Sequence, residues 1–151
     1  MTTIAYRNGI LAADSRVTTE SESAGDYASK CVKLLRVNDN IIALQGESGP
    51  GMAWLHWFRE GMTDEALAQS IRDAQNDFTA VVLNKRGLWT WDCWLIPEKV
   101  TARFYAAGSG TKAALGALHM GASAVQAVRV ACKIDPWSAP PIVSMSLNSN
   151  R

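Results

Sequence analysis

Apolar runs separated by turn residues divide much of the chain into strands that pair as hairpins. The first two runs lie on either side of Arg7-Asn8-Gly9, and Asn-Gly is a strong hairpin signal. The other predicted strands are CVKLLRV (31–37) with IIALQG (41–46), FTAVVLN (78–84) with LWTWDCWLI (88–96) and its continuation VTARFYAA (100–107), and a final IVSMSL (142–147). Residues 17–29 are rich in Thr, Ser and Glu, carry no periodicity and predict a surface loop.

Helical patterns occupy two stretches between these hairpins. In the first, Ser48-Gly49-Pro50-Gly51 interrupts regular secondary structure, and a short helix follows from Met52 to about residue 61. A second helix runs from an N-cap at Thr63 to about residue 76. The second is the alanine-rich stretch 111–134, interrupted at Gly121, which predicts two packed helices. Hairpins alternating with blocks of helices favour an α+β layered sandwich, and 151 residues suit one domain spanning 1–151.

The length of the first loop decides which residues of the first hairpin meet. A two-residue loop at Asn8-Gly9 pairs Thr3 with Asp14 and points Asp14 to the face opposite Thr2. A three-residue loop, with Gly9 left-handed, pairs Thr2 with Asp14 and puts both side chains on one face. We expect the three-residue loop, because a catalytic role for Thr2 requires a carboxylate on its own face.

Thr2 directly follows Met1, and this placement suggests a nucleophile. If Met1 is removed, Thr2 carries a hydroxyl and a free α-amino group, so that a nucleophile and a base lie on one residue. Lys33 is the second unusual residue, since alternation places it in an otherwise apolar row of the strand 31–37.

Other polar residues have structural explanations when each is taken singly. Asp14 and Arg16 would form a surface ion pair, Ser109 would cap a helix, and Asp135 would be a turn residue before Pro136. Jointly, however, these residues fall at the ends of predicted strands and helices, which favours a shared catalytic role.

Charge and cysteine content narrow the class of protein. The 15 basic residues balance 14 acidic ones, the net charge is +1 and no block of like charge occurs, so nucleic acid is not an expected partner. The three cysteines are far apart without metal-ligand spacing, which predicts reduced thiols, no metal site and no cofactor. Because no apolar run approaches the roughly twenty residues of a membrane span, we expect a cytoplasmic protein without membrane contact.

Four stretches together carry a resemblance to a known family. They are Thr2-Thr3 with AADSR (12–16), VKLLRVNDNIIALQG (32–46), Gly108-Ser109-Gly110 before a helix, and Asp135-Pro136-Trp137-Ser138. In this order they resemble the proteasome β-type subunits and the bacterial HslV peptidase, which are N-terminal-nucleophile (Ntn) hydrolases, and small bacterial or phage proteasome-like proteins. The resemblance covers nearly the whole chain and implies a four-layer αββα sandwich with two stacked, mostly antiparallel sheets.

The resemblance also implies roles for individual residues. Thr2 would be the nucleophile, Asp14 the acidic residue beside it, Arg16 a supporting residue and Lys33 the active-site lysine. Lys30 is a rival for the last role, because counting from Asp14 by the family's interval reaches Lys30, whereas aligning the following strand reaches Lys33. We prefer Lys33.

The remaining site residues follow from the same resemblance. The backbone N–H of Gly46 would stabilise the oxyanion, and Ser109, Asp135 and Ser138 would orient the amine of the nucleophile. The predicted first specificity pocket is apolar and lined by Val17, Cys31 and Leu44.

The expected function is that of a threonine endopeptidase that hydrolyses unfolded polypeptide inside a self-assembled homo-oligomeric ring or double ring. The sequence has no ATPase signature such as GxxxxGK[ST], so any unfolding ATPase would be a separate protein. Two alternatives stay open. One is a catalytically silent proteasome-like scaffold or assembly subunit that keeps Met1, and the other is an Ntn amidase acting on small amides.

Overall fold

The computed structural model describes residues 2–17, 29–30, 33–75 and 77–148. Most of the predicted surface loop, residues 18–28, lies outside the described residues. Its two ends form short strands instead of irregular loop, since β3 (Arg16–Val17) pairs with β4 (Ser29–Lys30).

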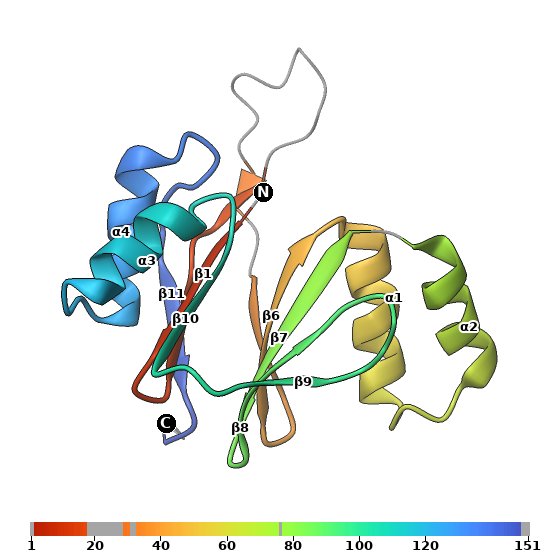
Figure 1. Cartoon of the computed structure of the whole chain (residues 1–151). Helices are drawn as coiled ribbons and strands as arrows, with labels where there is room; N and C mark the ends of the chain where they lie inside the picture. The colour runs from red at the N-terminus through yellow and green to blue at the C-terminus, as the bar shows by residue number, and fades with distance from the viewer. Residues whose placement is uncertain (1, 18–28, 31–32, 76, 149–151) are drawn as a thin grey trace, which may run out of the picture.

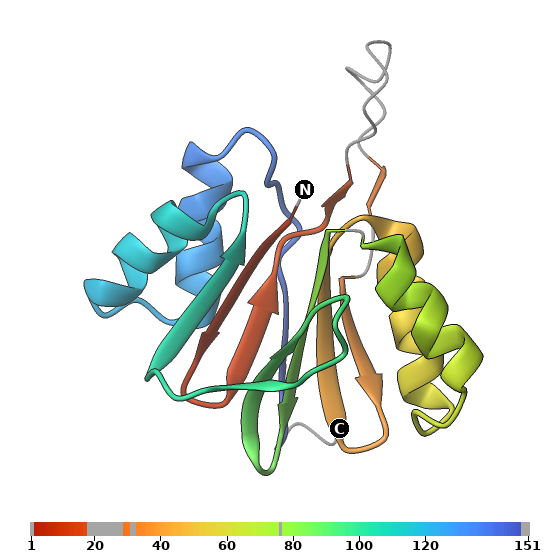
Figure 2. The ribbon, with the colours of Figure 1, turned by 45° about the vertical axis from the view of Figure 1, so that its right-hand side comes forward.

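Two antiparallel sheets lie face to face, with helices on both outer sides (Figures 1 and 2). The first sheet has the order β10 (Phe104–Gly108), β1 (Thr3–Arg7), β2 (Ile10–Ala13), β11 (Val143–Ser146). The second has the order β5 (Leu34–Val37), β6 (Asn40–Gly46), β7 (Phe78–Asn84), β8 (Gly87–Trp91), β9 (Glu98–Val100). Helices α3 (Thr111–His119) and α4 (Ala124–Ile134) cover the first sheet, and α1 (Ser48–Arg59) and α2 (Glu65–Ala74) lie on the side of the second.

Three apolar clusters separate the four layers. Ile4 and Ile41 belong to the cluster between the sheets, to which both sheets contribute. Ala5, which follows Ile4 in β1, faces the opposite side of the sheet because successive strand residues alternate. It packs against the alanines of α3 and α4. The third cluster joins the second sheet to α1 through Trp54 and its neighbours. The predicted four-layer αββα sandwich is therefore confirmed.

The expected three-residue loop of the first hairpin is wrong. Arg7 pairs with Ile10 and Ile4 with Ala13, which leaves a two-residue loop at Asn8-Gly9. Both loop residues are left-handed, with φ of 52° and 75°, as a type I′ turn requires, and such a turn matches the twist of the two strands. This register places Asp14 opposite Thr3 and not opposite Thr2, so the strand pairing that was expected to be required for a catalytic Thr2 is not formed. Asp14 instead contacts the backbone N–H of Thr3 and the Nζ of Lys33.

Both helices after the second hairpin differ slightly from the prediction. Residues 48–51, which were predicted to interrupt regular secondary structure, form the first turn of α1. Pro50 is tolerated there because the first N–H groups of a helix have no hydrogen-bond partner within the helix. The N-cap of α2 is Asp64 instead of Thr63, and its carboxylate accepts a hydrogen bond from the backbone N–H of Leu67.

The third hairpin is also shorter than predicted. β8 ends at Trp91, and the predicted continuation 100–107 splits between the two sheets, since Val100 ends β9 whereas Phe104–Gly108 forms β10 beside β1. The chain therefore returns to the first sheet here, and this return carries Gly108 and Ser109 to the start of β1.

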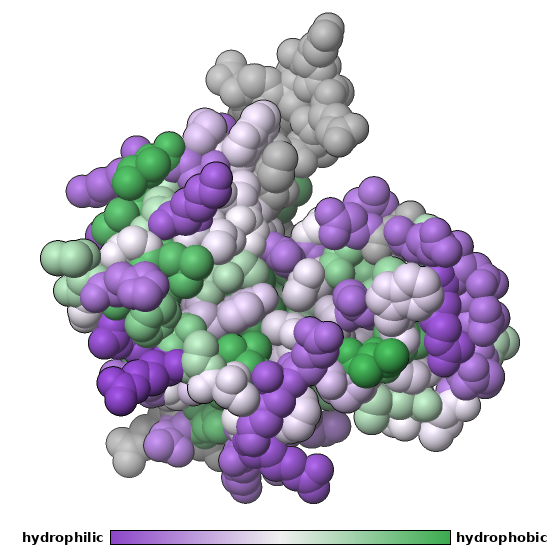
Figure 3. Space-filling model, in the orientation of Figure 1, coloured by the Kyte–Doolittle hydropathy of each residue, from purple (hydrophilic) through white to green (hydrophobic). Residues whose placement is uncertain are grey.

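Surface polarity differs between the two helical layers. Polar side chains gather along α2, whereas apolar patches lie over α3 and α4 (Figure 3). Among the described residues, no helix is long and apolar enough to cross a membrane.

Candidate active site

The start of β1 is buried and held by the turn after β10. Thr2 is 6% exposed, and its carbonyl oxygen accepts a hydrogen bond of 2.9 Å from the backbone N–H of Ser109. Gly108 has a φ of +99°, and a Cβ at this position would lie 1.7 Å from the Thr2 carbonyl oxygen. Only glycine permits this approach, so the sequence Gly-Ser-Gly before α3 serves to bring Ser109 against Thr2.

Asp14 and Lys33 form a buried ion pair next to this strand. The Nζ of Lys33 lies 2.8 Å from Oδ1 of Asp14, and the two side chains are 6% and 0% exposed. Three backbone N–H groups also donate to the carboxylate, those of Thr3 at 2.8 Å, Arg16 at 3.0 Å and Ala139 at 3.2 Å. Asp14 thus fixes the backbone beside Thr2 and keeps a cation close by.

The surface ion pair between Asp14 and Arg16 is absent from the described contacts. Arg16 gives Asp14 only its backbone N–H, whereas its guanidinium donates to the carbonyl oxygen of Pro136 at 2.9 Å. Arg16 therefore connects the start of β3 to the turn 135–138.

Lys33 lies one residue before β5, so its predicted position inside the strand is wrong. Its carbonyl oxygen still accepts a hydrogen bond from the N–H of Leu44. Because Lys33 lies outside the strand, the alternation of β5 does not decide the direction of its side chain, which donates to Asp14. The rival Lys30 belongs to β4, where its backbone pairs with Arg16.

A second network surrounds Asp135 at the end of α4. Its Oδ2 accepts hydrogen bonds from the hydroxyls of Ser109 at 2.7 Å and Ser138 at 2.6 Å. Burial acts to raise the pKa of the Asp135 carboxyl, but these bonds and the N–H of Trp137 outweigh burial and hold the pKa below its ordinary value of 3.8. The carboxylate is therefore ionised at neutral pH.

Gly46 ends β6 with a φ of +91°. A Cβ there would lie 2.2 Å from the carbonyl oxygen of Asp77, so the close approach of β7 also demands glycine. The preceding Gln45 places its Oε1 3.1 Å from the position of a Cβ on Gly108, which brings the end of β6 to the turn that holds Thr2.

The predicted specificity pocket is described only in part. Val17 is half-buried in β3, and Leu44 packs into the cluster under α1, where its Cδ1 lies 3.9 Å from the Cβ position of Gly51. Cys31 lies outside the described residues.

Two residues that contact the networks were not among the predicted site residues. Thr3 donates its N–H to Asp14, and its Oγ1 lies 2.6 Å from the Oγ of Ser138. Gly108 makes the close approach to Thr2. A type I′ register would have identified Thr3, because that register opposes Thr3 to Asp14.

Cys132 on α4 lies close enough to feel these charges. Burial raises the pKa of its thiol to about 11, the Asp14 carboxylate adds to this effect, and Lys33 opposes it. The thiol stays protonated at neutral pH and does not compete as a nucleophile. The described part of the chain contains no group of three or more His, Cys, Asp or Glu that could hold a metal ion.

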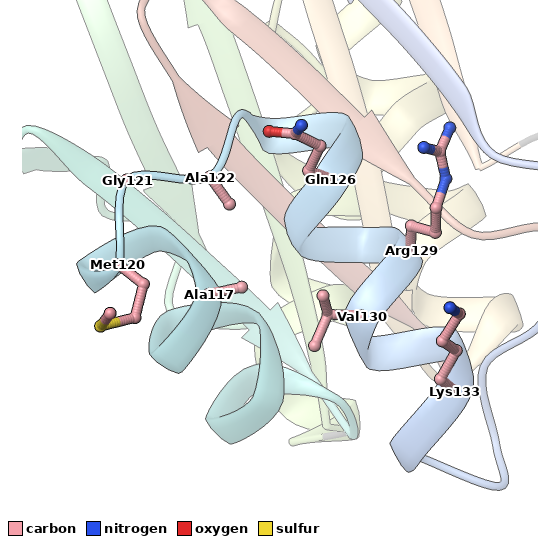
Figure 4. Close-up of a pocket in the computed structure, with 8 residues that line it drawn as sticks. All are labelled: Ala117, Met120, Gly121, Ala122, Gln126, Arg129, Val130 and Lys133. Atoms are coloured by element: carbon pink, nitrogen blue, oxygen red, sulfur yellow. The ribbon is translucent and has the colours of Figure 1, made fainter.

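A groove of about 530 Å³ lies elsewhere, between the facing sides of α3 and α4 (Figure 4). Its lining residues are Ala117, Met120, Gly121, Ala122, Gln126, Arg129, Val130 and Lys133. None of these lining residues carries a carboxylate or a hydroxyl, in contrast to the networks of Asp14 and Asp135 at the start of β1.

Comparison with known proteins identifies the fold. The sequence matches no protein-family model and no curated protein. Thiobacillus denitrificans BPH is similar in structure, with a TM-score of 0.68, 22% identity and coverage of 99% of both chains. The structure of the same protein in complex with epoxomicin gives a TM-score of 0.66 and 22% identity, and the match covers 97% of this chain and 98% of that chain. HslV from Trypanosoma brucei has a TM-score of 0.69 and 19% identity, and covers 95% of this chain and 97% of its own. The chain therefore has the fold of the proteasome-like Ntn hydrolases.

Proposed function

We propose that this protein is a threonine-type peptidase whose nucleophile is Thr2 after removal of the residue that precedes it. The observation that carries the proposal is the convergence of two polar networks on Thr2 and Thr3, where β1 begins. One contains a buried cation and carboxylate, Lys33 and Asp14, and the other contains the hydroxyls of Ser109 and Ser138 around Asp135. A buried ion pair is costly to form, so its presence at a strand end favours a catalytic use over a structural one.

The first step follows from the chemistry of an N-terminal threonine. A free α-amino group has a pKa near 7.7–8.0, so about a tenth or more of it is an uncharged base at neutral pH. The cation of Lys33 disfavours a second positive charge nearby and therefore lowers the pKa of this amine. The amine takes the proton of the Thr2 hydroxyl, and Oγ attacks the carbonyl carbon of a peptide bond.

The later steps complete the hydrolysis. The backbone N–H of Gly46 donates to the oxyanion of the tetrahedral intermediate. The C–N bond breaks, the leaving amine takes the proton from the α-ammonium group, and an ester on Thr2 remains. Water then attacks the ester with the amine as base, releases the carboxylic acid and restores the Thr2 hydroxyl.

The wider proposal concerns substrate and assembly. The fold shared with HslV and BPH supports a homo-oligomeric ring or double ring that admits unfolded polypeptide, with a separate ATPase as unfolding partner. Val17, Cys31 and Leu44 are the proposed lining of an apolar specificity pocket. Native mass spectrometry tests the assembly, and a monomer would contradict it.

The decisive experiment starts from protein whose chain begins at Thr2, prepared by cleaving an N-terminal fusion directly before this residue and verified by intact mass. We expect the protein to cleave fluorogenic peptides with an apolar residue before the scissile bond. Thr2→Ala should lower kcat/KM by at least about 1,000-fold, and Lys33→Ala by about 100-fold or more.

Matched controls separate the proposal from its alternatives. Lys30→Ala should keep kcat/KM within about twofold of the parent, because this lysine has no assigned role. Activity that survives Thr2→Ala would overturn the proposed nucleophile. Cleavage of small amides without cleavage of peptides would favour an amidase, and quantitative retention of Met1 in protein made in its natural host would favour a silent scaffold.

A further inference from the structure

Thr3 is fully buried, at 0% exposed. Alternation along β1 places its side chain on the same face as Ala5, which packs against α3 and α4, and on the face opposite that of Thr2. Its Oγ1 accepts a hydrogen bond of 3.1 Å from the N–H of Gly110 and lies 2.6 Å from the Oγ of Ser138. A Cβ on Gly110 would lie 2.2 Å from Thr3 Oγ1, so the glycine makes room for the hydroxyl. These contacts join β1, the start of α3 and the turn after α4.

The number of protons fixes the direction of every bond in this network. The Asp135 carboxylate is ionised and only accepts, so Ser138 donates its single hydroxyl proton to Oδ2. Ser109 also donates to Oδ2, at 2.7 Å, because its other contact, with the Thr2 carbonyl oxygen, is much longer at 3.4 Å. Ser138 then has no proton left for Thr3, and the 2.6 Å contact requires the Thr3 hydroxyl to donate to Ser138. The order is Gly110 N–H to Thr3, Thr3 to Ser138, and Ser138 to Asp135.

This order has consequences at Thr2. Bonds that run in one direction polarise one another, so the hydroxyl of Thr3 strengthens the bond from Ser138 to Asp135. Ser109 gives its proton to the same carboxylate and is left with lone pairs beside Thr2, whose carbonyl oxygen its N–H holds at 2.9 Å. In its neutral form, an α-amine on Thr2 can donate an N–H to these lone pairs and keep its own lone pair for the proton of the Thr2 hydroxyl.

We propose that the Thr3 hydroxyl is a positioning residue of the active site, which orders a one-way hydrogen-bond chain from Gly110 through Ser138 to Asp135. The proposal rests on the proposed function, because the group that benefits is the α-amine of Thr2. Threonine or serine at position 3 satisfies the chain, and an isosteric side chain without a hydroxyl does not. Removing the hydroxyl leaves the Gly110 N–H and one lone pair of Ser138 without their partner.

The test measures the titration of the Thr2 α-amine directly and so does not depend on catalysis. Protein that begins at Thr2 is labelled briefly with acetic anhydride across a pH series, and the labelled fraction of the N-terminal peptide is read by mass spectrometry. In Thr3→Val we expect the pKa of the amine to rise by about half a unit or more, because a less neutralised Asp135 carboxylate favours the ammonium form. Thr3→Ser should keep the amine pKa of the parent protein. In each variant, the acid limb of the pH profile of kcat/KM should shift together with the amine pKa.

The controls distinguish failure of the Thr3 proposal from failure of the proposed peptidase function. Thr90→Val removes a hydroxyl from a half-buried strand threonine outside the site and should leave the amine unchanged. A folded Thr3→Val protein with an unshifted amine overturns the positioning role, even if the enzyme is active. Absence of peptidase activity in the parent overturns the proposed function while the titration still tests the chain. If Thr3→Val does not fold, Thr3→Cys, with its weak donor, replaces it, and equal titration of the Ser and Cys variants overturns the proposal.

Discussion

Two carboxylates serve the start of β1 from opposite environments. Asp14 is fully buried and holds the cation of Lys33, whereas Asp135 is half-buried and accepts from two serine hydroxyls. Asp14 fixes the backbone of Thr3 through its N–H, and Asp135 acts on the hydroxyl of the same residue through Ser138. One threonine therefore connects the two networks, although its neighbour Thr2 is the proposed nucleophile.

The difference between them separates two tasks. A charge kept in a dry environment acts strongly on a nearby amine, since little solvent screens it. A carboxylate near water acts less strongly as a charge than a buried one, and it also orders the direction of the hydroxyl groups around it. We infer that Asp14 and Lys33 set the electrostatics of the site, and that Asp135 and its serines set its geometry.

The largest expected effect is that of Asp14→Asn. The change leaves the buried cation of Lys33 without its anion. It also puts an NH2 group either toward the Thr3 N–H and Lys33 or toward the N–H groups of Arg16 and Ala139. We expect the free energy of unfolding to fall by about 5 kcal/mol, the upper end for breaking a buried pair. Urea unfolding of the variant measures it, and a loss below about 1 kcal/mol would show that Asp14 is not held as described.

Lys33→Met should cost less, at about 3 kcal/mol, because three backbone N–H groups remain to satisfy Asp14. The double variant Asp14→Asn/Lys33→Met should be less damaging than the sum of the single changes by about 1–3 kcal/mol. The same urea unfolding series completes this double-mutant cycle. Additive losses would contradict a direct coupling between the two side chains.

Asp135→Asn tests the other carboxylate, and its effect on unfolding should be about 1–2 kcal/mol at pH 7. Because the pKa of Asp135 is lowered in the folded protein, its ionisation stabilises the fold above the unfolded pKa of 3.8, and this contribution is lost as the pH falls through the lower folded value. The difference between parent and variant should therefore shrink below pH 4. Unfolding curves at pH 7, 5 and 3 measure it, and a difference that grows in acid would contradict the lowered pKa.

Much of the fold was predictable because alternation and turn residues act locally. The hairpins and the paired helices of 111–134 follow from patterns a few residues long, and their order favoured an α+β layered sandwich. The four-layer αββα arrangement was implied by the family resemblance and not by these patterns. The register of the first hairpin was mispredicted because a presumed function was given more weight than the backbone preference of Asn8-Gly9 for a type I′ turn. The reach of Lys33 and the hydroxyl chain through Thr3 depend on contacts between segments distant in sequence, and no local pattern encodes their geometry.

The smallest expected effect is that of Arg72→Gln, which tests how burial changes the contribution of an ion pair to stability. Arg72 and Glu65 on α2 form an ion pair of 2.9 Å, almost the 2.8 Å of Lys33 and Asp14, but their side chains are 32% and 80% exposed. Arg72→Gln should lower the free energy of unfolding by less than about 0.5 kcal/mol, because solvent screens an exposed pair and its ordering costs side-chain entropy. Urea unfolding at low salt and at about 0.5 M NaCl should show the small loss only at low salt. A loss comparable to that of Lys33→Met would mean that distance, and not the dry environment, sets the weight of an ion pair in this protein, and the distinction drawn between Asp14 and Asp135 would then fail.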